Sequence, residues 1–473
     1  MADQILKLAL PTGNLRETVA NLLVQSDINV PGYESGSRVL SATAEETGIR
    51  FRIFREGDIP IQVALGNYDI GLCSDINLAE IQVRFPLERI KRIAALPSPV
   101  TEVWLAASPF SGLSAGEIPY GVDLSGVRIA SEYPNFVDLL AAHLQIPKYR
   151  SIPLYGAAEA YPPEDADLII LSVKNRSEIE NLDLVPLHCL YVGGLSLIGN
   201  SKTFSRSNLS SFIERLAPKF QNFEPRPSLP TSTVSKRIVM GERDTKVLRL
   251  ALPDGHAQRH TVAALSEAGI AYDGYSEDGF VRRPNSEHSG LEIKVVRPQD
   301  MPQLVADGSF DLAITGVDWL KEHLAKFPSS PVSMAVDLGR SRYSIGPVVH
   351  NDFPADTTSE ALEIWSGLER PIRIASEYPA LAEAFARDVQ LPRTGIIPIN
   401  GASEAFVPED ADILIEGTET GTSLRANNLK MLDPFLISTN CLISRNSPVT
   451  ERLGLQKEII EILNVAAAQN SVT

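Results

Sequence analysis

The sequence contains few cysteines and none of the spacings on which cysteine chemistry depends. Cys73, Cys189 and Cys441 are far apart, odd in number and never part of a CxxC or CxxH pattern. These features favour neither a disulfide framework nor a zinc site, and a reducing cytoplasm is expected. The sequence also lacks an apolar run of membrane-spanning length, and its first residues, MADQILKLALPTGN, do not resemble a secretion signal. We therefore expect neither export nor a membrane span.

Positive charge is also scarce. The chain has 43 lysines and arginines against 59 aspartates and glutamates, which gives a formal net charge of -16. Such a chain does not attract polyanions over long range, so general binding of nucleic acid or of anionic membranes is not expected. An anionic small ligand would need a local basic pocket. At 473 residues, with 44% hydrophobic and 22% charged residues, the chain should form several soluble globular units.

The chain repeats itself once. LKLALPTGNLRETVANLLVQSDI, from residue 6, returns as LRLALPDGHAQRHTVAALSEAGI from residue 248. VRIASEYPNFVDLLAAHL, from residue 127, returns as IRIASEYPALAEAFARDV from residue 372. Between the copies the sequence is rich in Pro, Ser, Thr and charge. We predict a first half over 1–220, a linker over 221–246 and a second half over 247–473.

Each half is predicted to have an α/β fold. Short apolar segments such as LKLAL, VRIAS and DLIIL alternate with longer segments of helical periodicity, such as NFVDLLAAHL. This alternation predicts parallel-rich sheets covered by helices. A half of this size should divide into two α/β lobes, the inner ones spanning about 106–185 and about 350–432. A ligand would then bind between lobes, at the carboxyl ends of strands.

One segment of the second half has the features of a phosphate site. EGTETGTSLRANNL begins at Glu416, follows the apolar run ADILI and precedes a predicted helix. Its small residues Thr420, Gly421, Thr422 and Ser423 offer successive backbone N–H groups and hydroxyls to an anion. The carboxylates of Glu416 and Glu419 would repel a phosphate, but they suit the vicinal hydroxyls of a ribose. Together they indicate a phosphoribosyl group.

The matching segment of the first half is not suited to phosphate. It reads SVKNRSEI and places Lys174 at the position of Glu419 and Arg176 at the position of Gly421. Glu178 adds negative charge where a phosphate would lie. We predict that this copy does not bind the phosphoribosyl ligand.

The second-half segment ADILIEGTETGTSLRANNL resembles the phosphoribosyl-diphosphate (PRPP) loop of ATP phosphoribosyltransferases, in which Asp is common at the position of Glu416. LALPTGNL, VRPQDMP, FDLAITGVD and RIASEYP resemble further segments of that family in the same order. The resemblance implies two lobes per half, like type II periplasmic binding proteins. It also implies transfer of the phosphoribosyl group from PRPP to N1 of ATP with Mg²⁺, the first step of histidine biosynthesis.

The resemblance also implies roles for individual residues. Family members use arginines of a neighbouring subunit for the leaving pyrophosphate, and Arg38 and Arg55 match them. We therefore expect the halves to pack as a pseudo-dimer, with one composite site per chain and with assembly into a homo-oligomer. The nucleotide side is assigned to Asp311, Thr315, Gly316 and Tyr378. No metal site made of protein ligands alone is predicted.

Departures from the family pattern leave two alternatives open. The lysine and arginine of the family's LPKGR segment are Thr12 and Asn14 in the first half, and Asp254 and His256 in the second. If these cations hold the pyrophosphate or triphosphate, the acceptor could differ from ATP. The other alternative is a regulatory or ligand-binding protein that has kept the fold without the catalysis.

Overall fold

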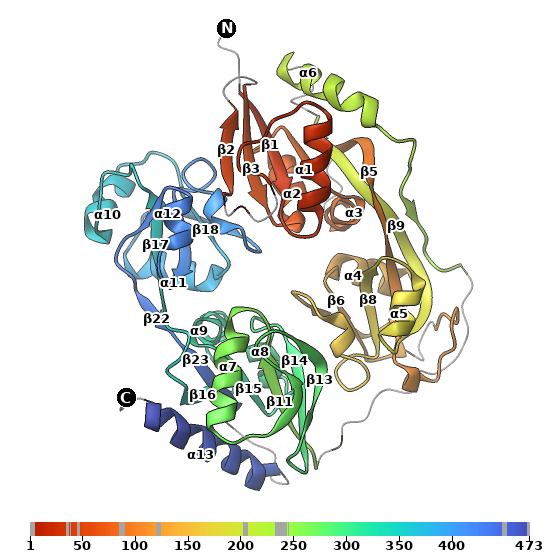
Figure 1. Cartoon of the computed structure of the whole chain (residues 1–473), viewed down its shortest axis with the longest axis vertical. Helices are drawn as coiled ribbons and strands as arrows, with labels where there is room; N and C mark the ends of the chain where they lie inside the picture. Colours follow the sequence, from red (N-terminus) through yellow and green to blue (C-terminus); the bar gives the residue numbers. More distant parts are fainter. Residues whose placement is uncertain are drawn as a thin grey trace.

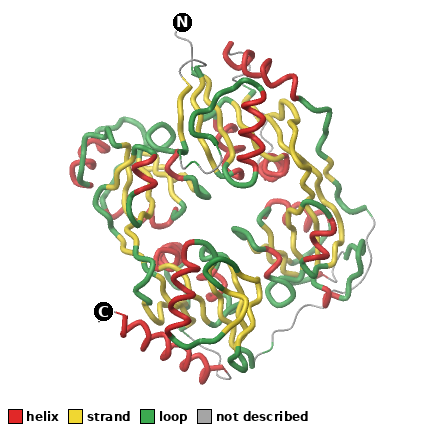
Figure 2. The backbone as a smooth tube through the Cα atoms, viewed as in Figure 1, coloured by secondary structure: helices red, strands yellow, loops and turns green. Residues whose placement is uncertain are grey.

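Four α/β lobes, two from each half, form a ring (Figure 1). The structure is a computed structural model that describes residues 5–34, 37, 39–44, 48–84, 90–119, 124–201, 207–231, 244, 246–446 and 452–470. In each lobe helices cover the faces of a sheet (Figure 2), which confirms the predicted α/β class. No described helix is both long enough and apolar enough to cross a lipid bilayer.

The first half forms one sheet in the order β2-β3-β1-β4-β9-β5-β8-β6-β7, with β10 added to β9. Its strands are β1 (Leu6–Pro11), β2 (Ser41–Ala44), β3 (Ile49–Phe54), β4 (Ile70–Ser74), β5 (Ile90–Ala107), β6 (Val127–Ser131), β7 (Tyr149–Pro153), β8 (Leu168–Val173), β9 (Val185–Asn200) and β10 (Arg226–Pro227). Its helices are α1 (Leu15–Gln25), α2 (Ile59–Leu65), α3 (Asp75–Arg84), α4 (Pro134–His143), α5 (Arg176–Asn181) and α6 (Ser207–Leu216).

The second half forms two larger sheets, in the orders β14-β11-β15-β23-β16 and β19-β18-β20-β17-β21, with β22 beside β17, and a ribbon of β12 and β13. Its strands are β11 (Leu248–Pro253), β12 (Tyr272–Tyr275), β13 (Phe280–Ser286), β14 (Leu291–Val296), β15 (Leu312–Gly316), β16 (Val332–Asp337), β17 (Tyr343–His350), β18 (Ile372–Ser376), β19 (Thr394–Pro398), β20 (Ile413–Thr418), β21 (Leu429–Met431), β22 (Leu436–Ser438) and β23 (Asn440–Arg445). Its helices are α7 (His256–Glu267), α8 (Met301–Ala306), α9 (Val317–Lys326), α10 (Thr358–Ser366), α11 (Pro379–Asp388), α12 (Thr422–Ala426) and α13 (Leu453–Asn470).

The central strands are buried on both faces, as their sequences predict. In β1, Leu6, Leu8 and Leu10 pack into one apolar cluster and Ala9 into another, and all four are fully buried. β1 pairs in parallel with both β3 and β4. Near-continuous apolar runs are typical of such doubly covered parallel strands.

The two halves pack against each other as a pseudo-dimer. The first lobe of each half contacts the second lobe of the other, so that Phe54 and Phe406 share one apolar cluster and Ile169 and Phe310 share another. Because sequence-equivalent lobes make the two contacts, each interface repeats the other.

Ion pairs at equivalent positions support this pseudo-symmetry. Lys294 donates to Glu164 at 2.7 Å, and its counterpart Arg52 donates to Glu409. In the interface that contains Lys294 and Glu164, the buried Arg249 donates to both carboxylate oxygens of Asp165, at 2.9 and 2.6 Å. A buried pair of this kind holds two surfaces in one register, since removing either partner leaves an uncompensated charge.

The segment predicted as a linker is partly ordered. β10 lies within it and pairs antiparallel with β9 through Arg226 and Val192. In addition, Ser228 N donates to Leu190 O at 2.8 Å. The beginning of the connection between the halves is therefore fixed to the outer side of the first half.

Candidate functional site

The predicted PRPP loop joins β20 to α12. Gly421 has φ +70°, a left-handed conformation that glycine adopts easily, and a Cβ there would lie 2.8 Å from Arg425 Nη1. The turn is held by the Gly421 N–H, which donates to Thr418 Oγ1 at 2.8 Å. The hydroxyls of Thr420 and Thr422 are 2.9 Å apart, and both residues are exposed. The predicted order of a strand, a loop of small residues and the start of a helix is therefore present, and Thr420 and Thr422 are open to a ligand.

Three carboxyl groups gather below this loop, and we call Glu377, Glu404 and Glu416 the acidic cluster. Ser403 Oγ donates a hydrogen bond to Glu416. Burial, followed by the charges of Glu377 and Glu404, raises the pKa of Glu416 to about 8. Burial also raises the pKa of Glu377 to about 7. Near neutral pH Glu377 and Glu416 therefore hold protons for part of the time, which lets them donate hydrogen bonds as well as accept them.

Arg55 of the first half reaches the acidic cluster of the second. A Cβ on Gly401 would lie 2.7 Å from Arg55 Nε and 2.9 Å from Glu377 Oε1, so only glycine leaves room for the guanidinium. The charge of Arg55 opposes the burial that raises the pKa of Glu377. Arg55 is exposed and forms no ion pair with any described residue. Its positive charge is thus available to an anionic ligand.

Hydrogen bonds from the neighbouring loop fix this approach. Asn400 donates to the buried Asp58 through its backbone N at 3.1 Å and through Nδ2 at 3.0 Å. Asp58 lies three residues after Arg55, and Asn400 precedes Gly401. The contact between the halves therefore sets the position of the arginine.

The first half contains an equivalent site whose cations are occupied. Arg297, the counterpart of Arg55, approaches Gly156, where a Cβ would lie 2.9 Å from its Nε. Here, however, Arg297 donates to Asp254 at 3.2 Å. Arg282 bridges Asp254 at 3.2 Å and Glu159 at 2.8 Å. The positive charge at this second position is largely neutralised within the protein.

The equivalent site of the first half also lacks the hydrogen-bonded pair that Ser403 and Glu416 form in the second. Leu171 stands at the position of Glu416, and Ala158 at that of Ser403. Both belong to an apolar cluster against which the partly buried Trp104 packs. Trp104 lies opposite Leu171 in the strand pairing, just as Gly346 lies opposite Glu416. A hydrogen-bonded pair has thus been replaced by two apolar residues, a change that costs little stability.

The first-half loop satisfies its own backbone. Lys174 N donates to the Glu178 carboxylate at 2.7 Å, and Glu178 N donates to Asn175 Oδ1 at 3.3 Å. The N–H of Glu178, at the position of Ser423 in the predicted phosphate loop, is therefore already bonded to a side chain, as is the N–H of Lys174 just before that loop. This arrangement supports the prediction that the copy does not bind PRPP.

The predicted nucleotide residues occupy different places. Asp311 precedes β15 and accepts from Arg249 N at 2.9 Å and from Arg452 at 2.7 Å. Gly316 is the last residue of the same strand, so Asp311 and Gly316 lie at opposite ends of β15. Thr315 is buried, and its hydroxyl donates to Pro298 O at 2.9 Å. Their contact with a nucleotide stays a prediction.

Tyr378 and Gly316 both lie close to Asp318, a residue that the sequence did not indicate as functional. Tyr378 Oη donates to the buried Asp318 at 2.7 Å, and its ring packs on Trp319 at a centroid distance of 4.5 Å. A Cβ on Gly316 would lie 1.9 Å from Asp318 Oδ1. Asp318 could have been suspected from its place just after the strand in FDLAITGVD.

The sequence analysis also missed Ser403 and Gly401. The signal was present in the repeated segments NGASEAF and YGAAEAY, which keep the glycine and differ at Ser403 and Ala158. Arg38 lies outside the described residues. No group of three or more His, Cys, Asp or Glu side chains within the described part of the chain could hold a metal ion by itself.

Comparison with known proteins places the chain in a family. The family model described as HisG: ATP phosphoribosyltransferase matches residues 55–221 and again 297–465. The ATP phosphoribosyltransferase of Chlorobium chlorochromatii is 32% identical over 206 residues, 42% of this chain and 64% of that protein. That of Methanothermobacter thermautotrophicus is 28% identical over 217 residues, 45% of this chain and 69% of that protein.

Solved structures resemble the chain only loosely. The ATP phosphoribosyl transferase (HisG:HisZ) complex from Thermotoga maritima matches with a TM-score of 0.37 and 21% identity, over 47% of this chain and all of that one. The VFT2 domain of Bordetella pertussis BvgS matches with a TM-score of 0.29 and 17% identity, over 47% of this chain and 88% of that one. The chain spans about 64% of the length of the Chlorobium relative. Matched twice by one family model over most of its length, the chain belongs to the HisG family of ATP phosphoribosyltransferases, as a tandem duplication.

Proposed function

We propose that this chain transfers the phosphoribosyl group of PRPP to N1 of ATP, which yields phosphoribosyl-ATP and pyrophosphate, the first step of histidine biosynthesis. One composite site per chain performs the reaction. The observation that carries this proposal is the approach of Arg55, from the first half, to Gly401 and Glu377 beside the intact loop of the second. The remaining parts of the site follow from the chemistry of the substrates.

The loop of the second half binds PRPP. The backbone and hydroxyls from Thr420 to Ser423 hold the 5-phosphate, since the two threonine hydroxyls are adjacent and exposed. Glu416 and Glu419 receive the ribose hydroxyls. Because its pKa is raised to about 8, Glu416 repels the phosphates of the ligand less than a permanently ionised carboxylate would.

Charge and position provide the catalysis. The attacking ring nitrogen is neutral and needs no base, so the barrier comes from an oxocarbenium-like ribose and a departing polyanion. Arg55, together with Arg38, stabilises the pyrophosphate as it leaves. When ionised, the carboxylates of the acidic cluster would stabilise positive charge on the ribose. Preorganised charges of this kind contribute more in a site shielded from water than in solution.

Mg²⁺ fits this site as a companion of the substrate. The ion prefers one or two carboxylates together with phosphate oxygens and water. Glu377 and Glu404 offer such carboxylates beside Arg55, and the diphosphate of PRPP would complete the set. When bound, the ion would neutralise the diphosphate.

One observation favours a second candidate, a PRPP-binding protein with another acceptor or with a regulatory role. Asp254 stands where the family has a lysine, and it is buried and bonded to Arg282 and Arg297. That loop therefore offers a carboxylate, already paired, where the family offers a cation to a polyphosphate.

The test is to incubate the full chain with PRPP, ATP and Mg²⁺, with pyrophosphatase to draw the reaction forward, and to detect phosphoribosyl-ATP by mass spectrometry. We expect the product from the unaltered chain and not from the Thr420→Ala, Thr422→Ala double variant. A chain that binds PRPP but forms no product with ATP would refute the proposed reaction. A panel of purine and amine acceptors would then separate the two forms of the second candidate.

A further inference from the structure

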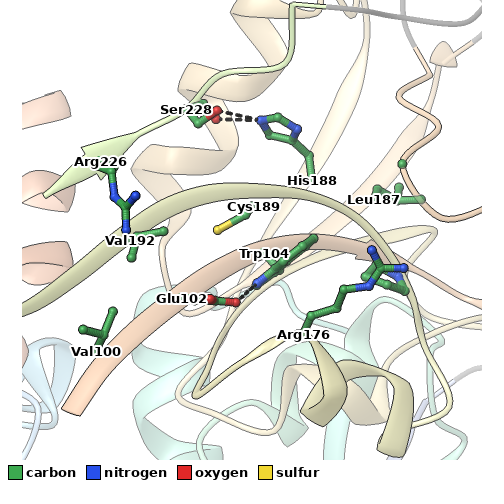
Figure 3. A pocket seen from close by; sticks show the side chains of 12 residues that line it. Val100, Glu102, Trp104, Arg176, Leu187, His188, Cys189, Val192, Arg226 and Ser228 are labelled. Carbon is green, nitrogen blue, oxygen red and sulfur yellow. Dashed lines mark hydrogen bonds between the residues drawn. The ribbon is translucent and has the colours of Figure 1, made fainter.

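The first half contains a separate pocket beside β5 and β9 (Figure 3). Its volume is about 500 Å³, and its walls come from β5, β9, the start of α5 and the ordered beginning of the connection between the halves. Trp104 and Cys189 line its centre, and Arg176, His188 and Arg226 lie around them. A volume of this order suits a small metabolite.

The pocket is built from the positions at which the halves differ. Arg176 stands where the PRPP loop has Gly421, and Trp104 stands where β17 has Gly346. Arg226 and Ser228 belong to the connecting segment that follows β9. Two of the side chains that line the pocket therefore stand where the second half has glycine.

These groups give the pocket a positive character in a strongly acidic chain. Arg226 forms no ion pair with a described residue. Burial and Glu102 raise the pKa of Cys189, and Arg226 lowers it, which is consistent with the place of Arg226 beside the thiol. Glu102 is already engaged, because it accepts from Trp104 Nε1 at 2.7 Å.

The second arginine is also available. Arg176 is paired with Glu180 at 3.1 Å, but both side chains are more than half exposed, so the pair is weak and can open. His188 Nε2 lies 3.0 Å from Ser228 O, and this contact fixes the connecting segment over the pocket. Two guanidinium groups thus lie around an aromatic ring.

We propose that this pocket binds a small planar anion, a ring compound that carries a phosphate or carboxylate group. The ring packs on Trp104, and the anionic group lies between Arg176 and Arg226. Guanidinium groups pair with phosphate and carboxylate through two parallel hydrogen bonds, and aromatic rings stack on indole. A nucleoside monophosphate has the size and both chemical parts, so AMP is the probe. This site does not depend on the proposed transferase activity.

Cys189 allows the site to be tested directly. Cys73 and Cys441 are fully buried, whereas Cys189 is partly exposed and lines the pocket. The full chain is treated with iodoacetamide at mildly alkaline pH, and alkylation of Cys189 is followed by mass spectrometry of its peptide. We expect millimolar AMP to slow this alkylation severalfold. AMP bound at another site would not shield this thiol.

Variants then separate the parts of the proposal, each compared with and without AMP. Arg226→Ala and Arg176→Gly should each raise the AMP concentration needed for half protection by about tenfold or more, since each removes a charged hydrogen-bond donor. Lys148→Ala, an exposed lysine of the same lobe that does not line the pocket, should behave as the unaltered chain. The Thr420→Ala, Thr422→Ala variant should keep full protection.

Two results would overturn the proposal. One is an alkylation rate of the unaltered chain that does not change when AMP is present at about 10 mM. This concentration lies far above the dissociation constant expected for two charged contacts and one stacked ring. The other is equal protection by AMP and by adenosine, which lacks the phosphate, because the arginines would then play no part.

Discussion

The two composite sites of this chain share one framework and differ in their contents. In each, an arginine of one half passes a glycine of the other, Arg55 at Gly401 and Arg297 at Gly156. At the first, the arginine forms no ion pair with a described residue. At the second, Arg297 is bonded to Asp254. The framework is therefore the same whether its arginine is paired within the protein or not, because the contact between the halves repeats at both sites.

The two halves also differ in one pair of side chains beside the loops. Glu416 and Ser403 form a polar pair in the second half, and Leu171 and Ala158 form an apolar pair in the first. Either complete pair is stable, whereas a mixture would bury an unpartnered polar group. Leu171 and Ala158 of the first half are therefore well packed without a hydrogen-bond partner.

The largest effect is expected from the arginines. Arg55→Ala should lower kcat/KM for phosphoribosyl-ATP formation by about 10²–10³-fold, the range for removing a group that stabilises developing charge. The matched variant Arg297→Ala should leave kcat/KM close to that of the unaltered chain. Steady-state kinetics would check both. Equal losses in the two variants would contradict a single working site.

A smaller effect is expected in PRPP binding. Thr420→Ala with Thr422→Ala should weaken binding by roughly 10–100-fold, through loss of hydrogen bonds to a charged group. Calorimetric titration with PRPP would measure it. Asn175→Ala with Ser177→Ala, at the equivalent positions of the first half, is the control. Unchanged affinity in the second-half variant would exclude the loop as the PRPP site.

Exchange of residues between the copies should lower the stability of the chain, and more strongly in the first half than in the second. Leu171→Glu places a carboxylate beside Ala158 and Trp104 with no hydrogen-bond donor like Ser403, and should destabilise the chain by about 1–3 kcal/mol. Adding Ala158→Ser should recover part of this loss. Glu416→Leu leaves the buried Ser403 hydroxyl with only its longer contact to Glu404, at 3.4 Å, so it should destabilise the chain by less than Leu171→Glu does, and it should abolish PRPP binding. Thermal unfolding would measure all three, and a Leu171→Glu variant as stable as the unaltered chain would argue against tight apolar packing there.

The smallest effect concerns pH. Burial and the neighbouring carboxyl groups raise the pKa of Glu416 to about 8, against 4.5 for the ordinary side chain. Its contribution to stability is therefore complete below about pH 4.5 and is lost as the pH rises through about 8. As the pH rises from about 4.5 to about 8, the melting temperature of the Glu416→Gln variant should fall less than that of the unaltered chain, by roughly a few degrees.

A control isolates this contribution. Glu377 remains in the Glu416→Gln variant and keeps part of the pH dependence, since its pKa is raised to about 7. Glu419→Gln, which removes an exposed carboxylate of the same loop, should follow the profile of the unaltered chain. Identical profiles for Glu416→Gln and the unaltered chain would mean that the buried carboxyl does not hold its proton.

Much of the fold and part of the site could be predicted from local sequence. Apolar runs such as LKLAL specify strands covered on both faces, and the glycine in ETGT specifies a turn that a larger residue would strain. Asp318, Gly401 and Ser403 were not predicted. Their importance comes from neighbours distant in sequence, such as Tyr378 for Asp318 and Arg55 for Gly401.

The duplication, the α/β class and the difference between the two loops can be read from local sequence, because each is carried by residues adjacent along the chain. The folded chain was needed to show which arginine is paired and which is available, how far burial raises the pKa of Glu416, and that Trp104 and Arg226 line one pocket. These properties depend on distances and solvent exclusion between segments that are not adjacent along the chain, which local patterns do not encode.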